Sequence, residues 1–136
     1  MMGPPQVVPP SKEVFAVMGA ENLQRMIADF YAELAQSSIA HLFPQPLDGA
    51  IQRSYWYFAG LLGGPATYLE QRGHPRLRQR HMGFAIDEAA KNEWLRCFEK
   101  VLATAPDRYR FPAEHLPVFR NFLHAFAAWM VNRGES

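Results

Sequence analysis

The stretch ENLQRMIADFYAEL, residues 21–34, carries the clearest structural pattern in the chain. Its apolar residues recur at spacings of three and four, which is typical of an amphipathic α-helix with one buried face. The residues on that face are Leu23, Met26, Ile27, Phe30, Tyr31 and Leu34. The pattern therefore predicts a helix that turns Tyr31 toward the interior of the protein.

Two segments farther along the chain show the same spacing. One runs from Asp87 to about Thr104, and the other follows Pro106 and Pro112 and ends near Gly134. Their apolar rows are Ala90, Trp94, Phe98, Val101 and Leu102 in the first, and Phe119, Phe122, Leu123, Phe126 and Met130 in the second. Each row predicts a long helix packed along one side.

A helix over about 48–62, with Asp48 as its candidate cap, ends at Gly63-Gly64-Pro65. Two glycines followed by a proline that lacks an N–H cannot continue a helix. Two apolar rows overlap within this segment, one of Ala50, Ser54, Phe58 and Leu61 and one of Ile51, Tyr55, Phe58 and Leu62. The sequence leaves open which row faces the core.

Shorter elements fill the rest of the chain. Ser11 is expected to cap a short helix that ends at Gly19, and residues 38–43 are expected to form a single turn. A loop is expected after Pro65, and residues 75–81 are expected to form a short helix. No segment has the alternation of a strand, and no glycine-rich nucleotide motif occurs. The sequence predicts an all-α domain.

Length and composition bound the possible classes of protein. The 136 residues suit one domain, predicted over 12–133, after a proline-rich and disordered tail over 1–11. A net charge of +1 argues against a nucleic-acid or membrane partner, and no apolar run is long enough to span a bilayer. The lone Cys97 and the absence of a signal-like start lead us to expect a cytoplasmic protein.

Among the five histidines, His81 has the most informative surroundings. On a helix it would share a face with Arg78, Leu77 and His74, which lie three, four and seven positions earlier. Residues 71–81 hold four arginines and no acid, so the net charge of the remaining chain is +1 − 4 = −3. That balance favours a small dianionic ligand over a polyanion, and haem with its two propionates is such a ligand.

Several short motifs resemble, in order and near spacing, those of the group II truncated haemoglobins. They are Phe30-Tyr31, Leu42-Phe43-Pro44, Gly63-Gly64-Pro65 with Tyr68, the run from Arg72 to His81, Phe84-x-Ile86 and Trp94-Leu95. The resemblance covers about residues 12–131. It implies a two-over-two helical sandwich that holds haem b without a covalent bond.

The resemblance also implies roles for individual residues. His81 matches the proximal iron ligand, while Tyr31 and Trp94 match distal residues that donate hydrogen bonds to a bound gas. Ala50 falls at the distal gate and Ser54 one turn later, if the alignment has no gap before Gly63. The remaining expected haem contacts are Phe43, Phe58, Tyr68, His74, Leu77, Arg78 and Phe84. Taken alone, a tyrosine or tryptophan in an apolar row is a core residue, and a serine there bonds its own helix.

The expected function is binding of dioxygen and related ligands such as NO and CO. Two donors to one ligand would slow its release, which suits storage, sensing, nitric-oxide dioxygenation or peroxidase-like turnover better than transport. Redox turnover would need a separate reductase, and the sequence assigns no catalytic residue. The alternatives are a haem-based gas or sulfide sensor and a haem-free helical interaction module; either a monomer or a homodimer is expected.

Overall fold

The computed structural model describes residues 6–43, 45–73, 76, 82 and 84–133 of the chain. These residues form α-helices and short 3₁₀ turns, and none of them lies in a strand, as the sequence predicted. The elements are α1 (Val14–Met18), α2 (Ala20–Ala35), η1 (Ala40–Leu42), α3 (Asp48–Leu61), α4 (Thr67–Arg72), α6 (Glu88–Leu102), α7 (Ala105–Tyr109), η2 (Ala113–His115) and α8 (Leu116–Met130).

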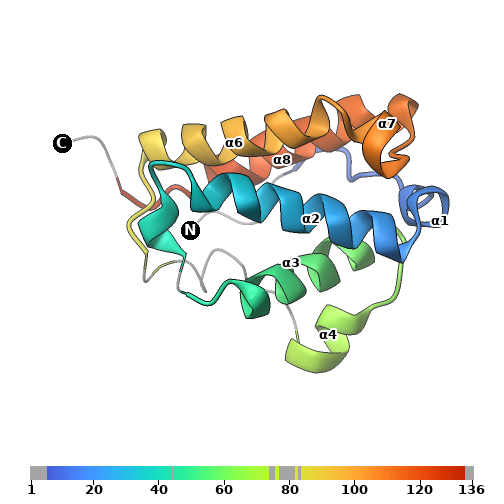
Figure 1. The fold of residues 1–136 in the computed structure, drawn as a ribbon, viewed down its shortest axis with the longest axis horizontal. Helices are drawn as coiled ribbons and strands as arrows, with labels where there is room; N and C mark the ends of the chain where they lie inside the picture. The colour runs from blue at the N-terminus through green and yellow to red at the C-terminus, as the bar shows by residue number, and fades with distance from the viewer. Residues whose placement is uncertain (1–5, 44, 74–75, 77–81, 83, 134–136) are drawn as a thin grey trace.

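Four long helices form two antiparallel pairs. Helix α2 runs beside α3, and α6 runs beside α8, with α2 also packed on α6 (Figure 1). This arrangement is the predicted two-over-two sandwich. None of the helices in the described part of the chain is long and apolar enough to cross a membrane.

Aromatic rings join the two pairs at the centre of the sandwich. The fully buried ring of Phe98 on α6 stacks on Phe30 of α2, with ring centres 4.1 Å apart. It also meets the edges of Phe58 on α3 and Phe119 on α8, at 5.7 and 6.0 Å. Every long helix therefore contributes a ring to one cluster, and burial of such rings is a major source of stability.

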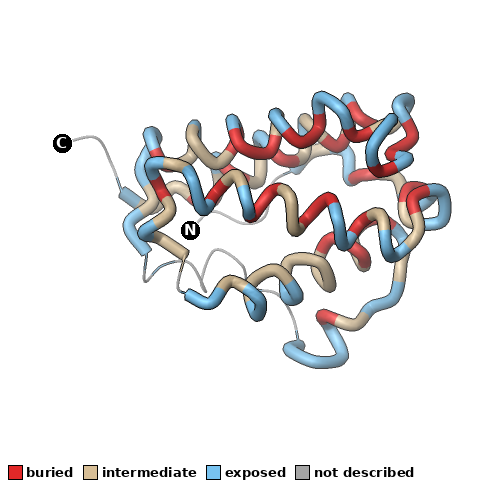
Figure 2. Tube along the Cα trace, in the orientation of Figure 1, coloured by how far each residue is buried: buried red, intermediate tan, exposed pale blue. Residues whose placement is uncertain are grey.

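The buried face of α2 is the one that the sequence predicted. Its buried residues are Leu23, Met26, Ile27, Phe30, Tyr31 and Leu34. Helix α3 differs, because its buried residues are confined to Phe58 and Ala59 near its end (Figure 2). The first half of α3 borders a cavity, and Ala50, Ile51 and Tyr55 are only partly buried there.

The double glycine after α3 has a packing role as well as a helix-ending one. The N–H of Phe15 donates to the carbonyl of Leu62 at 3.0 Å, so the start of α1 lies directly against this turn. A Cβ on Gly63, whose φ is +99°, would lie 1.9 Å from the carbonyl oxygen of Lys12. A Cβ on Gly64 would lie 2.7 Å from the Phe15 ring. Only glycine allows this approach.

Two predicted helix starts need correction. Helix α1 begins at Val14, and the Ser11 hydroxyl accepts the N–H of Glu13 at 3.1 Å instead of capping the helix. Asp48 is the first residue of α3 and makes no capping hydrogen bond. By contrast, the Asp87 carboxylate accepts the Ala90 N–H at 2.8 Å, which caps α6 and explains its start at Glu88.

The connections and the last helix end also differ from the prediction. The loop expected after Pro65 contains α4, and α7 and η2 occupy a connection for which no element was predicted. Helix α8 ends at Met130, before the predicted end near Gly134, because the N–H groups of Asn132 and Arg133 both donate to the carbonyl of Ile86. Of the helix predicted over 75–81, only Arg76 is described, and its φ of +44° is not helical.

Replacing Gly63 with alanine should destabilise the fold by about 2–4 kcal/mol, because the new Cβ adds a clash to backbone strain. Gly19 offers a matched control, since its φ is +83° but a Cβ there would meet nothing within 4 Å. Gly19→Ala should therefore cost only the strain, about 1–2 kcal/mol. Urea unfolding of both variants measures the difference, and equal losses would contradict a packing role for Gly63.

Candidate functional site

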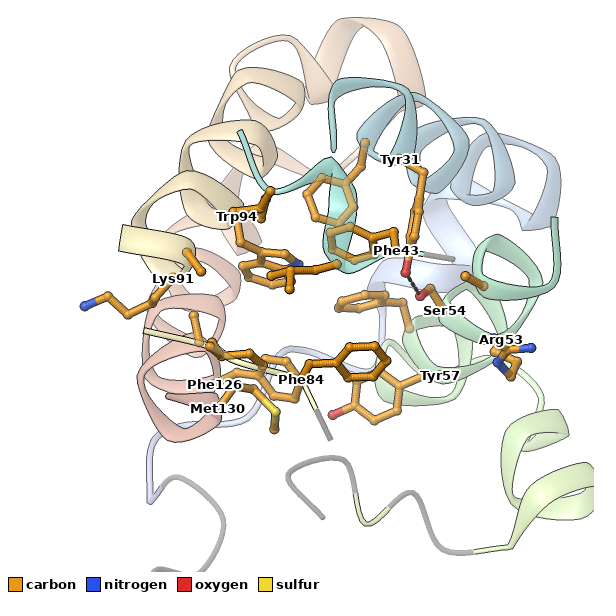
Figure 3. Close-up of a pocket in the computed structure, with 18 of the residues that line it drawn as sticks. Tyr31, Phe43, Arg53, Ser54, Tyr57, Phe84, Lys91, Trp94, Phe126 and Met130 are labelled. Carbon is orange, nitrogen blue, oxygen red and sulfur yellow. Dashed lines mark hydrogen bonds between the residues drawn. The ribbon is translucent and has the colours of Figure 1, made fainter. Parts of the chain in front are cut away.

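A cavity of about 460 Å³ lies between the two helical pairs, which is within the usual range for a small-molecule site. Its walls come from α2, α3, α4, α6, α8 and the connections before α3 and α6 (Figure 3). Eight of the residues predicted for the site line it, namely Tyr31, Phe43, Ala50, Ser54, Phe58, Tyr68, Phe84 and Trp94. The fold thus brings together side chains that lie far apart in the sequence.

A hydrogen bond between Tyr31 and Ser54 fixes the register of α3. The two hydroxyl oxygens are 2.6 Å apart, so Ser54 bonds Tyr31 across the helix pair (Figure 3). Ala50 and Phe58 line the cavity on the same row as Ser54, whereas Ile51 and Tyr55 are not among its lining residues. Arg53, which precedes Ser54, also borders the cavity.

The Tyr31 hydroxyl is buried and neutral. Burial raises its pKa above the usual value, and the hydrogen bond with Ser54 and the charge of Arg53 oppose that rise more weakly. Either hydroxyl can donate in the Tyr31–Ser54 pair. When Ser54 donates, the proton of Tyr31 is free to point at a ligand in the cavity.

Trp94 lines the cavity on the side opposite the Tyr31–Ser54 pair. Its indole packs edge-on against Phe30 and Phe98, with ring centres 5.4 and 5.3 Å away, and its nitrogen faces the middle of the cavity (Figure 3). Phe43 meets the edge of Tyr31 at 5.9 Å. Edge-on contacts of this kind are favourable and hold the rings in fixed orientations.

Tyr57 also lines the cavity, although it is not among the residues that the sequence predicted for the site. It follows Ser54 by one helical turn, so the choice of the Ser54 row could have identified it. Its ring lies 6.1 Å from Tyr68 and 6.2 Å from Phe126. Burial, with a smaller effect of Tyr68, raises the pKa of Tyr57 to about 12.

Other lining residues were also not assigned to the site beforehand. Phe126 and Met130 belong to the apolar row predicted for the last helix, and Lys91 precedes Trp94 by three positions. Arg53 and Lys91 stand on opposite sides of the cavity with their charged ends directed outward (Figure 3). The Lys91 amine pairs with Glu88 at 2.7 Å.

The expected residues His74, Leu77, Arg78 and His81 lie outside the described part of the chain. Their roles therefore stay predictions. Among the described residues, no group of three or more His, Cys, Asp or Glu side chains could hold a metal ion.

The lining suits a flat, largely apolar ligand with anionic edges. Aromatic rings supply most of the walls. The two hydroxyls, from α2 and α3, lie across the cavity from the Trp94 indole of α6 (Figure 3), and Arg53 and Arg72 add positive charge to the lining. Haem has this combination of a porphyrin plane and two propionates. The side chains present therefore fit haem.

The two-over-two sandwich and its cavity define the class of truncated globins. Residues 13–131 match the bacterial-like globin family, and the chain belongs to that family. Globins bind haem and small gas ligands.

Three relatives illustrate the match. The group 2 truncated haemoglobin YjbI of Bacillus subtilis is 28% identical over 90% of each chain. The phosphate-bound structure of Hell's gate globin IV has a TM-score of 0.87 and 32% identity, covering 97% of this chain and 82% of that one. The haemoglobin of Chloroflexus aurantiacus has a TM-score of 0.81 and 30% identity, covering 93% of this chain and all (100%) of that one. These likenesses confirm the predicted family.

Replacing Tyr57 with phenylalanine should make the protein less sensitive to alkali. The pKa of Tyr57 is about 12 in the folded protein and 10.0 in an unperturbed tyrosine. As the pH rises above about 10, the unfolded chain therefore loses the Tyr57 proton while the folded protein keeps it, which favours unfolding. Stability should thus fall less steeply between pH 9 and 11 in Tyr57→Phe than in the parent protein. Urea unfolding across this range measures the slopes, and identical slopes would contradict the raised pKa.

Proposed function

We propose that the cavity binds haem b without a covalent bond and holds dioxygen, or the related ligands NO and CO, beside Tyr31 and Trp94. The observation that carries this proposal is the Tyr31–Ser54 hydroxyl pair, which shares an otherwise aromatic cavity with the Trp94 indole. A relative from Bacillus subtilis with a TM-score of 0.77 and 28% identity is described as an oxygen-avid truncated haemoglobin. That description supports dioxygen as the ligand here.

His81 is the proposed proximal ligand, and Arg78 with the described Arg53 supplies charge for the propionates. When bound, haem supplies an iron atom with one coordination position open to a diatomic gas. Phe43, Phe58, Tyr68 and Phe84 provide the apolar walls, with His74 and Leu77 as further proposed contacts. Ala50 is small, which leaves room beside the hydroxyl pair.

Tyr31 and Trp94 decide how long a ligand stays in the cavity. A polar diatomic ligand attracts hydrogen-bond donors, and both the Tyr31 hydroxyl and the Trp94 indole N–H are donors. In a cavity that excludes water each bond contributes roughly 1–3 kcal/mol, so the pair slows release by about one to four powers of ten. Ser54 orients the Tyr31 hydroxyl and keeps it from being buried without a partner.

Slow release favours storage, sensing or redox work on the ligand over transport. Nitric-oxide dioxygenation and peroxidase-like turnover are the two reactions that such a site supports. Repeated nitric-oxide dioxygenation would need electrons from a separate reductase, whereas peroxidase-like turnover would take electrons from the substrate that it oxidises. Which of the two reactions the protein carries out depends on the reductant that is available to it.

Purification should yield a protein with a Soret absorption band, or one that gains the band when haem is added. His81→Ala should lose tight haem binding, or recover it when imidazole is supplied, because the axial ligand is gone. His124→Ala is a suitable control, since His124 lies on α8 and its ring nitrogen is 3.5 Å from Glu99. A normal five-coordinate ferrous spectrum in His81→Ala would rule out this ligand, and lasting absence of the band in the parent protein would leave a haem-free interaction module.

Tyr31→Phe and Trp94→Phe should each speed dioxygen dissociation, and the effect on carbon monoxide should be smaller because that ligand carries less charge. Stopped-flow rates of the two single variants and the double variant form a thermodynamic cycle. A coupling of about 0.5 kcal/mol or more would show that both side chains act on one ligand.

Ser54→Ala separates orientation from donation in the same experiment. It leaves both proposed donors in place but removes the partner 2.6 Å from the Tyr31 oxygen, so dissociation should change less than in Tyr31→Phe. Unchanged dioxygen rates in both Tyr31→Phe and Trp94→Phe would show that these aromatic residues only pack the cavity.

A further inference from the structure

One wall of the cavity comes from a short connection instead of a long helix. Residues 37–43, called here the 37–43 segment, link α2 to α3 and include η1. Ile39, Leu42 and Phe43 of this segment line the cavity, and Phe43 packs against Tyr31. The position of the segment therefore sets the shape of the cavity next to the hydroxyl pair.

Local hydrogen bonds fold the 37–43 segment onto itself. The Ser37 hydroxyl donates to the Leu34 carbonyl at 2.7 Å and accepts the N–H of Ile39 at 3.2 Å. The N–H of Ala40 donates to the Ser37 carbonyl. These bonds define a turn at the end of α2. A firm connection to α6, which carries Trp94, needs more than the weak hydrogen bond between the Ser37 hydroxyl and the Cys97 thiol.

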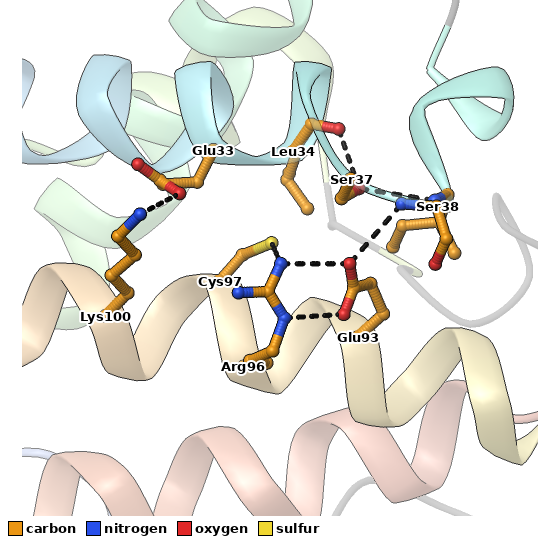
Figure 4. A network of polar contacts seen from close by, with 9 residues as sticks. Glu33, Leu34, Ser37, Ser38, Glu93, Arg96, Cys97 and Lys100 are labelled. Atoms are coloured by element: carbon orange, nitrogen blue, oxygen red, sulfur yellow. Dashed lines mark hydrogen bonds and ion pairs between the residues drawn. The ribbon is translucent and has the colours of Figure 1, made fainter.

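The Glu93 carboxylate makes that connection. It accepts the backbone N–H of Ser38 at 3.3 Å, across 55 positions of sequence (Figure 4). Arg96 donates to both oxygens of the same carboxylate, at 2.7 and 3.0 Å. The hydrogen bonds from Arg96 are the main reason why the pKa of Glu93 is held below its usual value, so the acceptor is ionised at neutral pH.

Glu93 and Trp94 are adjacent on α6 but point in different directions. Consecutive residues on an α-helix are separated by about 100° around its axis. Trp94 accordingly lines the cavity while Glu93 reaches the 37–43 segment at the edge of the sandwich. If the 37–43 segment moves relative to Glu93, it therefore also moves relative to the Trp94 indole on the same helix.

We propose that Glu93 is a positioning residue that holds the 37–43 segment against α6 and thereby fixes Phe43, which packs on the Tyr31 ring, relative to Trp94. Glu93 does not line the cavity and acts through Ser38, whose backbone N–H and hydroxyl both hydrogen-bond the carboxylate. The geometric inference stands on the described contacts, and only its consequence for gas release rests on the proposed function.

A second tie between α2 and α6 helps to separate this role from general stabilisation. The Lys100 amine pairs with Glu33 at 3.0 Å, more than one helical turn from Glu93, so α2 itself stays joined to α6 when Glu93 is changed (Figure 4). Loss of the Glu93 carboxylate should therefore loosen the 37–43 segment without separating the helices.

Three variants test the proposal in the full chain. Glu93→Ala removes the acceptor, and Glu93→Gln keeps an oxygen that can accept the Ser38 N–H. Glu99→Ala is the matched control, because Glu99 is also on α6 and pairs with Arg120 at 2.7 Å, toward α8 and away from the segment.

Amide hydrogen exchange provides a measurement that does not depend on haem. The Ser38 amide should exchange about fivefold or more faster in Glu93→Ala, and near the parent rate in Glu93→Gln and Glu99→Ala. Equal exchange at Ser38 in Glu93→Ala and the parent protein would overturn the proposal, whatever the ligand of the cavity is.

Dioxygen release from the haem-loaded protein tests the consequence. Dissociation should be faster by about threefold or more in Glu93→Ala, with rescue in Glu93→Gln and little change in Glu99→Ala. Faster exchange with unchanged gas release in every variant would refute positioning of the cavity by Glu93. Failure of the parent protein to bind haem would instead count against the proposed function and leave the exchange result as the test.

Discussion

The contact of the Phe98 ring with rings from the other three long helices is the interaction on which the rest of the structure depends. Phe98 stacks on Phe30 and meets the edges of Phe58 and Phe119. Since aromatic rings prefer offset and edge-on contacts at limited distances, this cluster sets how closely the two helical pairs approach each other. The cavity lies beside it, in the space that the rings leave open.

That placement explains how polar groups are tolerated inside an apolar sandwich. A buried hydroxyl without a partner is costly, and Tyr31 avoids this cost by bonding Ser54 from the neighbouring helix. The same bond leaves a proton available for a ligand. The packing of Trp94 against Phe30 and Phe98 holds the second proposed donor, so the aromatic cluster supports the site directly.

Much of the fold could be predicted because its signals are local. The buried face of α2 follows from spacings of three and four, and the end of α3 follows from Gly63 and Gly64. Helix caps were harder to predict, because Asp87 caps α6 whereas Ser11 and Asp48 do not cap their helices. The predicted end of α8 was wrong because it depends on a distant group. The N–H groups of Asn132 and Arg133 donate to the carbonyl of Ile86, whereas in a longer helix they would donate to carbonyls of α8.

The sequence by itself determined the helical class, the family and the residues that face inward on α2. On α6 the predicted apolar row left out the buried Leu95 and Cys97. Helical periodicity and short motifs are properties of neighbouring residues, so they need no knowledge of the fold. Only the tertiary structure decided that Ser54 is the residue on α3 that meets Tyr31, and that Glu93 reaches Ser38. Both pairs join separate elements, and their distances are set by how helices pack across the aromatic cluster.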